Sequence, residues 1–218
     1  MRRLILVLAV SCAAILAVGL AYVGFMAVDA DSGRVFRNVT GAMEPTLMMG
    51  DRFTTRSLRG EKGELLPVNR GDLVIHEWPP DPTKLFVKRV VGLPGDTLAM
   101  REGVLQLNRR PVREPYAWHD EPAIDPVAED FRWQRDFLVG PLAADSARHA
   151  PSRNNWGPVA VPPGAFFVLG DNRDNSLDSR YWGFLPAENV VGRARRVYFS
   201  RDPTMGRIRW ERFGRLLR

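Results

Sequence analysis

The sequence predicts a mostly β protein, in which a single N-terminal transmembrane helix precedes an antiparallel β core that carries an inserted variable lobe. Three observations support this fold class. The 218 residues include 19 glycines and 17 prolines, which favour turns over long helices. Short runs of β-branched and aromatic residues recur along the chain. The segment from Leu4 to Val28 contains no charged side chain.

The N-terminal segment has the length and the flanking charges of a membrane anchor. As a helix, residues 4–28 would extend about 37 Å, more than the roughly 30 Å of a bilayer's hydrocarbon core. Two arginines precede this segment and two aspartates follow it, so the positive-inside rule places residues 1–3 in the cytoplasm. We therefore expect a single-pass protein of the inner (cytoplasmic) membrane whose remaining residues are periplasmic or otherwise extracytoplasmic. A secretory signal cleaved at residues 28–30 is the alternative, although its apolar stretch normally spans only about 7–15 residues.

The positive charge of the chain is concentrated at its C-terminal end. The formal net charge is +6, yet residues 193–218 hold nine arginines and only two acidic residues. The rest of the chain is close to neutral, which argues against nucleic acid as a partner. Residues 206–218 alternate arginines with apolar side chains, which is typical either of a segment on an anionic membrane surface or of a terminal strand or helix with a basic face. The single cysteine, Cys12, excludes a disulfide framework.

The residues after the anchor predict strands joined by tight turns. Runs of β-branched and aromatic residues predict strands at 72–77, 85–91, 97–100, 104–107, 165–169 and 196–199. The short link at residues 101–103 predicts a hairpin. Residues 108–160 differ from the rest, since they are rich in proline, acidic residues and isolated tryptophans. We expect them to form a variable insertion in a β core made of residues 32–107 and 161–218.

Lys88 is one of only three lysines among 31 basic residues. The period of two along a strand puts Phe86, Lys88 and Val90 on one face. A lysine on an apolar face usually extends its ammonium group into water. The alternative is a buried amine whose pKa is lowered, which can act as a general base near neutral pH.

The densest polar stretch, residues 170–183, follows a predicted apolar strand directly. Its aspartates and asparagines do not alternate as the ligands of a calcium loop do, because Arg173 interrupts them. The spacing instead predicts two ion pairs within the loop, Asp171–Arg173 and Asp178–Arg180. A loop made rigid in this way is a place where an orienting hydroxyl, that of Ser176 or Ser179, is held.

Several blocks of the sequence, all in the same order, resemble bacterial type I signal peptidase. They are the segment 4–28, residues 38–47 (NVTGAMEPTL), 70–72 (RGD), 87–96 (VKRVVGLPGD) and 170–183 (GDNRDNSLDSRYWG). The resemblance covers most of residues 36–200 and leaves residues 108–160 unmatched. It implies a membrane-bound serine endopeptidase on a mostly antiparallel β fold, which removes N-terminal signal peptides from exported preproteins by a Ser/Lys acyl-enzyme mechanism.

The resemblance also implies roles for particular residues. Lys88 corresponds to the general base, a role that a permanently protonated arginine cannot fill. Ser176 corresponds to the hydroxyl that orients the lysine amine. Asp178 and Arg180 correspond to a supporting ion pair of the same loop.

Substrate binding is expected at two backbone segments. The resemblance implies that extended backbone at Glu44 and Pro45, and at Leu85, Phe86 and Val87, pairs with the substrate as added β-strands. The expected partners are preproteins with signal peptides and the lipid bilayer, and the expected oligomeric state is a monomer. No metal or organic cofactor is implied.

One departure from the family concerns the nucleophile. The family has a serine in the block Ser-Met-x-Pro-Thr-Leu, where this chain has Ala42. Thr40 and the backbone N–H of Ala42 still correspond to the site that binds the oxyanion. Because alanine has no nucleophilic oxygen, the covalent step should be absent.

Two explanations of Ala42 are open. In the first, which we favour because the base and the orienting serine are retained, the chain is an inactive variant of an active peptidase. In the second, it is a natural non-catalytic protein that binds signal peptides or acts as a scaffold. A peptidase dedicated to pilus or conjugation precursors is a narrower enzymatic alternative.

Overall fold

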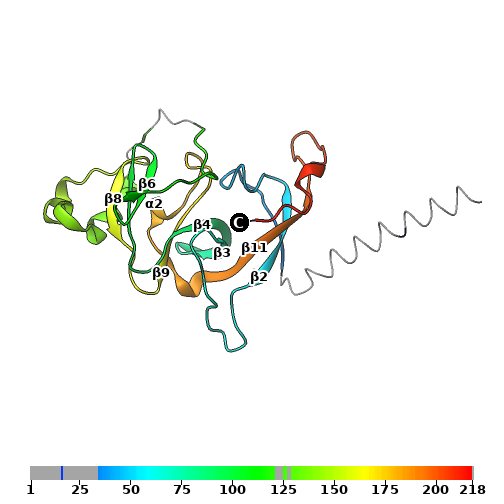
Figure 1. Cartoon of the computed structure of the whole chain (residues 1–218), viewed down its shortest axis with the longest axis horizontal. Coiled ribbons are helices and arrows are strands. Elements are labelled where there is room, and N and C mark those ends of the chain that lie inside the picture. The colour runs from blue at the N-terminus through cyan, green and yellow to red at the C-terminus, as the bar shows by residue number, and fades with distance from the viewer. Residues whose placement is uncertain (1–15, 17–33, 121–124, 127–128, 218) are drawn as a thin grey trace, which may run out of the picture.

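The computed structural model describes residue 16 and residues 34–120, 125–126 and 129–217, which are coloured in Figure 1. Among them, seven strands form one sheet in the order β1 (Val35–Arg37), β2 (Asp51–Ser57), β11 (Val190–Ser200), β3 (Leu73–Trp78), β4 (Asp81–Gly92), β9 (Ala165–Leu169) and β10 (Leu185–Pro186). A second sheet has the order β7 (Arg110–Pro111), β6 (Val104–Leu107), β5 (Thr97–Arg101) and β8 (Trp156–Ala160). All neighbouring strands run antiparallel, which confirms the predicted mostly antiparallel β fold.

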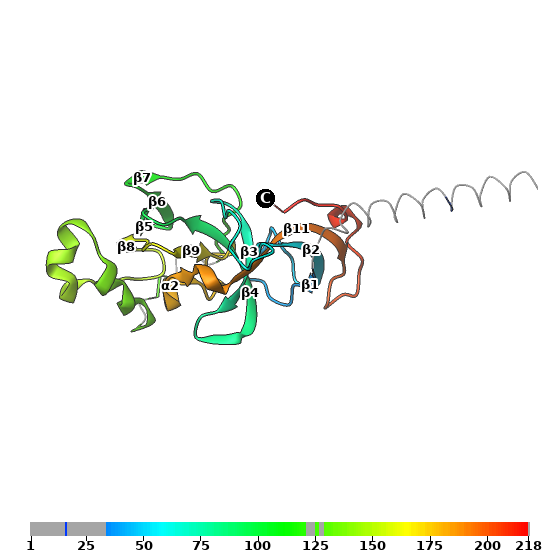
Figure 2. The ribbon, with the colours of Figure 1, turned by 90° about the horizontal axis from the view of Figure 1, so that it is seen from below.

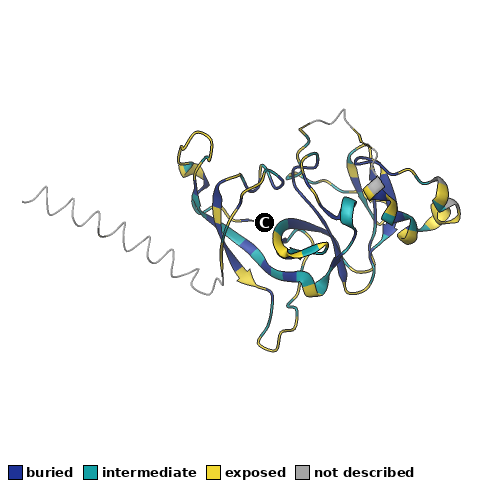
Figure 3. Ribbon diagram, turned by 180° about the vertical axis from the view of Figure 1, so that it is seen from behind, coloured by how far each residue is buried: buried dark blue, intermediate teal, exposed yellow. Residues whose placement is uncertain are grey.

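The two sheets occupy different parts of an elongated molecule. β1, β2 and the turn that follows β11 lie at one end, and the last residues of the chain return toward the middle (Figures 1 and 2). The smaller sheet lies toward the other end, together with the 3₁₀ helices η1 (Glu129–Phe137) and η2 (Gly140–Arg148). Figure 3 shows that exposed residues gather in hairpin tips and loops, whereas the strands between them are largely buried. The polar loop that follows β9 ends in the short helix α2 (Ser179–Trp182).

Clusters of buried apolar residues hold the sheets together and fix the turn at residues 42–47. One cluster joins the smaller sheet to β9, where the rings of Trp156 and Phe167 stack with their centroids 5.1 Å apart. A second cluster packs Met43 and Leu47 against β2, β3 and β11. Met43 and Leu47 are 1% and 0% exposed. Because both side chains are fully buried, the turn that carries residue 42 is anchored in the core.

The structure confirms the expected strands and extends two of them, β4 and β11. The hairpin of β5 and β6 is also confirmed, and its turn places Glu102 and Gly103 at φ angles of 50° and 77°. Within residues 108–160, β8 pairs with β5. The end of that segment is therefore part of the smaller sheet.

The C-terminal residues fold back onto β11 rather than extending away from it. Isolated bridges join Arg201 to Ile208 and Arg196 to Leu216, and the 3₁₀ helix η4 (Trp210–Arg212) lies between the two bridges. The buried Leu217 packs in the same cluster as Met43. This part of the chain is thus a terminal segment packed on the sheet, with exposed arginines along it.

No described helix is long and apolar enough to cross a membrane. The expected anchor at residues 4–28 lies, apart from Leu16, outside the described residues.

Candidate active site

Lys88 lies in β4, where it pairs with Val74 of β3. The residue is only 4% exposed, and its Nζ lies 5.3 Å from the centroid of the Phe86 ring. Burial lowers the pKa of Lys88 to about 8, partly opposed by the negative charge of Asp178, which raises it. Of the two interpretations of this lysine, the structure supports the buried amine.

Ala42 begins a turn that packs closely against the core. The amide of Leu47 donates to the carbonyl of Met43 at 2.8 Å. The side-chain amide of Asn38 donates to the carbonyls of Thr40, at 2.9 Å, and of Leu47, at 3.1 Å, and so connects both ends of the turn. Ala42 itself is 8% exposed. The position of the missing nucleophile is therefore fixed by backbone hydrogen bonds and by buried neighbours.

One expectation about this turn is wrong. Glu44 and Pro45 lie within the turn and not in extended backbone, because Asn38 and the buried side chains on either side of them bend the chain there. The carboxylate of Glu44 accepts a hydrogen bond from the amide of Met49 at 3.3 Å, within the same local structure. These two residues therefore do not offer a strand edge to a substrate.

The polar loop after β9 contains one of the two predicted ion pairs. Arg180 donates to both carboxylate oxygens of Asp178 at 2.8 Å, and both residues are fully buried. The predicted pairing of Asp171 with Arg173 is wrong. Asp171 instead accepts two hydrogen bonds, at 2.8 and 2.7 Å, from Arg89 of β4. The loop is thus joined to the strand that carries Lys88.

Arg173 also has a partner that the sequence did not suggest. It forms a bidentate ion pair with Glu114, at 2.7 and 2.8 Å, and its Nε donates to the carbonyl of Gly170. Glu114 belongs to the segment expected to be a variable insertion. This ion pair therefore joins that insertion to the polar loop.

The hydroxyl of Ser176 is buried beside residue 42. Its Oγ has no hydrogen-bond partner among the described residues, and Ser176 is 6% exposed. A Cβ atom on Gly170 would lie 2.2 Å from this Oγ and 2.5 Å from the carbonyl oxygen of Ala42. Because glycine has no Cβ, position 170 leaves room for the Ser176 hydroxyl and the Ala42 carbonyl to lie against the end of β9. Ser179, the other candidate, has its hydroxyl occupied by the amide of Val168 at 3.0 Å.

Residues 118–120 cover the polar loop. The sequence did not predict this contact. Trp118 forms a parallel bridge to Asn172, with its amide donating to the carbonyl of Asp171 at 2.7 Å. The side chain of Asn172 donates to Asp120 at 2.6 Å. No periodic pattern marked these residues, so no signal in the sequence pointed to them.

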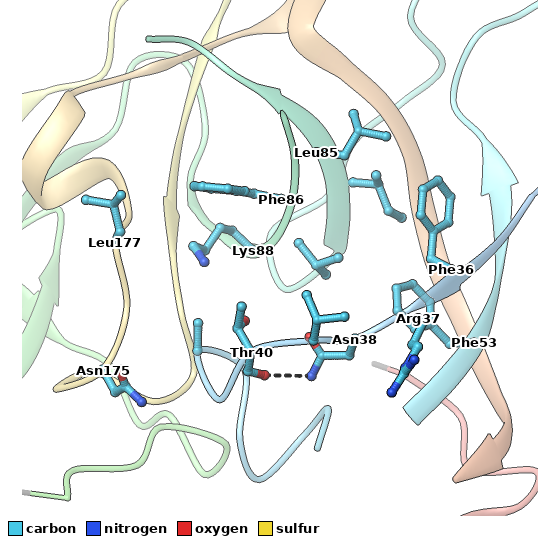
Figure 4. A pocket seen from close by; sticks show the side chains of 14 residues that line it. Phe36, Arg37, Asn38, Thr40, Phe53, Leu85, Phe86, Lys88, Asn175 and Leu177 are labelled. Atoms are coloured by element: carbon cyan, nitrogen blue, oxygen red, sulfur yellow. Dashed lines mark hydrogen bonds between the residues drawn. The ribbon is translucent and has the colours of Figure 1, made fainter. Parts of the chain in front are cut away.

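A pocket of about 330 Å³ opens beside these residues and is mainly apolar. Its lining includes Ala42, Lys88 and Thr40 (Figure 4). In Figure 4 the Lys88 side chain and Thr40 lie next to each other, and Phe36 and Phe53 form the far part of the wall. The structure thus brings Lys88 next to Thr40 and Ala42, which lie 48 and 46 positions before it in the sequence. This pocket is the candidate active site.

The strand β4 presents an open edge to this pocket. Leu85, Phe86 and Val87 pair with β3 on one side, whereas β9 pairs with β4 only from Arg89 onward. All three residues line the pocket. Their second edge is therefore not paired with any described strand and is available to an extended peptide.

His76 is a buried neighbour of Lys88 that the sequence did not single out. It is 0% exposed, and its Nδ1 is 2.8 Å from the carbonyl oxygen of Glu77, so Nδ1 carries the proton. Burial lowers the pKa of His76 to about 4. The ring packs against Phe86, with centroids 6.2 Å apart. Lys88 is therefore flanked by a neutral side chain.

Comparisons with known proteins show which family the sequence matches. The family model described as signal peptidase, peptidase S26, matches residues 4–199. The chain is 31% identical over 160 residues to signal peptidase I of Leptolyngbya laminosa, a match that covers 70% of this chain and 62% of that protein. It is 33% identical over 198 residues to signal peptidase I of Pseudomonas aeruginosa, covering 79% and 67%.

A solved structure is also similar in sequence. The crystal structure of a signal peptidase I from Enterococcus faecalis V583 is 27% identical, with a TM-score of 0.39, covering 60% of this chain and 98% of that one. The match to the Leptolyngbya protein spans less than two thirds of its length. Since the family model matches most of the residues, this chain belongs to the signal peptidase family, peptidase S26.

Proposed function

We propose that this chain is a membrane-anchored Ser/Lys signal peptidase, and that Ala42 at the nucleophile position makes it inactive. The observation that carries the proposal is the buried amine of Lys88, which lines the same pocket as residue 42. A buried amine with a lowered pKa is the property that a general base needs near neutral pH. At pH 7, a pKa of about 8 leaves roughly a tenth of these amines neutral.

The chemistry of an Ala42→Ser chain follows from these positions. The serine hydroxyl gives its proton to neutral Lys88 as its oxygen attacks the carbonyl carbon of the scissile bond. The oxyanion accepts hydrogen bonds from the backbone N–H of residue 42 and from the Thr40 hydroxyl. When the C–N bond breaks, the Lys88 ammonium returns the proton to the departing amine. Lys88 then removes a proton from water, whose oxygen attacks the acyl-enzyme. When the ester bond breaks, the Lys88 ammonium returns the proton to the serine oxygen.

The remaining polar residues hold the base in place. The Ser176 hydroxyl, which has no partner among the described residues, is free to accept a hydrogen bond from the Lys88 amine. The buried Asp178–Arg180 pair fixes the loop that carries this serine. Asp178 also accepts a hydrogen bond from the amide of Gly170 at 3.0 Å.

The substrate would bind along the open edge of β4. Extended backbone of a signal peptide would pair with residues 85–87, and alternate side chains would enter the apolar pocket. Because Glu44 and Pro45 are in a turn, pairing on that side falls to other backbone groups of residues 38–42. The preprotein substrate and the bilayer are the proposed partners, and the proposed state is a monomer.

The proposed location is the inner membrane. Residues 4–28 would form the single membrane anchor, and residues 1–3 would lie in the cytoplasm. The β core, made of residues 32–107 and 161–218, would lie on the extracytoplasmic side together with its insertion at residues 108–160. Alkaline carbonate extraction of membranes tests this anchor. Recovery of the intact chain in the soluble fraction would contradict it.

Ala42 itself favours a second candidate function, that of a natural protein that binds signal peptides without cleaving them. The pocket and the strand edge of such a protein would be intact, as they are here. A dedicated peptidase for a few precursors would differ from both in cleaving a narrow set of substrates once serine is restored.

A preprotein cleavage assay in detergent micelles tests the proposal. We expect no cleavage by the chain itself, cleavage by Ala42→Ser, and loss of that cleavage in Ala42→Ser/Lys88→Ala. Loss of the nucleophile in a serine peptidase costs on the order of a millionfold in kcat. Lys84→Ala in the Ala42→Ser background is the matched control, because Lys84 is an exposed lysine of the same strand. A folded Ala42→Ser chain that binds precursors but does not cleave them would support the binding protein instead.

A further inference from the structure

A second pocket, of about 340 Å³, is lined by three arginines and belongs to the opposite face of β1 and β2. Alternation along the two strands separates the faces. Phe36 and Phe53 are paired across the ladder and line the candidate active site. Arg37 and Arg52, the next pair of the same ladder, line the second pocket. Arg37 also borders the candidate active site (Figure 4). Arg201 completes the set of arginines there.

This arrangement places like charges opposite one another. Arg37 and Arg52 are direct cross-strand partners, and like charges in such a position destabilise a sheet. Arg52 packs over the ring of Phe199, 5.5 Å from its centroid. The Nε of Arg201 donates to the carbonyl of Gly206 at 3.0 Å. These contacts fix two of the guanidinium groups without neutralising them.

The one carboxylate in the lining is already occupied. Asp202 forms an ion pair with Arg209 at 2.7 Å. Its other oxygen accepts the amides of Thr204 and Met205, at 2.8 and 2.9 Å. Within the described parts of the chain, Arg37, Arg52 and Arg201 form no ion pair with a carboxylate. The pocket therefore has an uncompensated positive charge.

We propose that this arginine pocket binds the phosphate group of an anionic phospholipid. Guanidinium groups bind phosphate oxygens in bidentate fashion and are always charged. The choice of a lipid rests on the anchor in the proposed function. Arg37 lies nine positions after Val28, the end of that segment, and nine extended residues reach at most about 30 Å. The adjoining turn exposes Met205 (73%) and Ile208 (40%), which suits contact with a bilayer.

Binding there would orient the catalytic core. The same two strands carry the arginine pocket on one face and the Phe36–Phe53 wall of the candidate active site on the other. A headgroup held by Arg37 and Arg52 would therefore set the height of the peptide-binding pocket above the membrane.

The test measures binding of fluorescently labelled phosphatidylglycerol to the full chain in neutral detergent micelles. We expect Arg37→Gln/Arg52→Gln/Arg201→Gln to weaken binding by about a hundredfold, at roughly 1 kcal/mol for each arginine. The matched control removes three exposed arginines in and next to β7 of the smaller sheet, Arg109→Gln/Arg110→Gln/Arg113→Gln. This control should change affinity less than about twofold. The proposal would be overturned if the two variants weakened binding equally, or if neither variant weakened it.

Further arms separate the sources of phosphate and guard against misfolding. Inorganic phosphate at millimolar concentration should compete with the labelled lipid in the parent chain. If inorganic phosphate binds but labelled phosphatidylglycerol does not, the site takes free phosphate and the choice of a lipid is wrong. Arg37→Gln alone, at an exposed strand residue, provides a variant that keeps its fold if the triple variant does not. If the chain proves not to be anchored in a membrane, the arginine pocket should still bind inorganic phosphate, so the two proposals can fail separately.

Discussion

The backbone amide of Asn172 donates a hydrogen bond to the carbonyl of Ala42 at 3.1 Å. The same residue uses its side-chain amide to hold Asp120 at 2.6 Å. One asparagine therefore connects the nucleophile position to the segment that covers the polar loop. A segment with no periodic sequence pattern takes part in positioning residue 42.

This connection predicts that Asp120→Ala lowers peptidase activity in the Ala42→Ser background. Without the carboxylate, the loop and residue 42 lose a constraint, and small displacements of a nucleophile cost on the order of tenfold to a hundredfold in rate. Kinetic analysis should show a lower kcat with a nearly unchanged KM. Asp120→Asn, which keeps one acceptor oxygen, should recover part of the loss. Asp130→Ala, at an exposed residue of η1, is the control, and an equal effect of both changes would contradict the role of Asp120.

The pKa of Lys88 predicts the pH dependence of the Ala42→Ser enzyme. Burial lowers this pKa to about 8, and only the neutral amine accepts the serine proton. We therefore expect kcat/KM to rise about tenfold for each pH unit below 8 and to level off above it. Initial rates of cleavage between pH 6 and 9 measure this. A profile that is flat from pH 6 to 8 would exclude Lys88 as the group that titrates.

The same burial predicts that Lys88→Met stabilises the fold. The folded pKa is lowered from 10.5 to about 8, so between these values the unfolded chain binds more protons and stability rises with pH. Below pH 8 the cost of burying the charge is fully present, at up to roughly 3 kcal/mol. Denaturant unfolding at pH 7 should show the gain, which should shrink toward pH 10.5. Lys84→Met, at an exposed lysine, should show no such pH-dependent gain.

The sequence predicted what depends on local pattern and missed what depends on distant partners. The strands, the hairpin and the Asp178–Arg180 pair follow from alternation or from short spacing. Asp171 pairs with Arg89, 82 residues away, and no local spacing signals a partner that the folded sheet supplies. The turn at residues 44–45 was missed because the side chain of Asn38 sets its shape.

His76 predicts a loss of stability in acid. Its pKa is lowered from 6.5 to about 4 by burial, so between these values the unfolded chain binds more protons. Stability should therefore fall as the pH drops from 6.5 and should have lost roughly 3 kcal/mol from this group near pH 4. His76→Phe removes the titrating group. The difference in unfolding free energy between parent and variant should grow over this range, and a constant difference would contradict the assignment.

The buried ion pair predicts an asymmetric response to mutation. Arg180→Met leaves Asp178 charged and buried without its partner, which should destabilise the fold by about 3–5 kcal/mol. Lys84→Met breaks an exposed pair with Asp81, and such pairs contribute at most about 1 kcal/mol. Thermal unfolding of the two variants checks this. Similar shifts in Tm for both would mean that the pair at Asp178 does not hold the loop.

Gly170 sets a limit on how this site can be redesigned. A single added methyl group there would collide with both the Ser176 hydroxyl and the Ala42 carbonyl. Attempts to change cleavage preference should therefore leave this position untouched and vary the pocket wall at Phe36 and Phe53 instead. Little tolerance to engineering is therefore expected at this glycine.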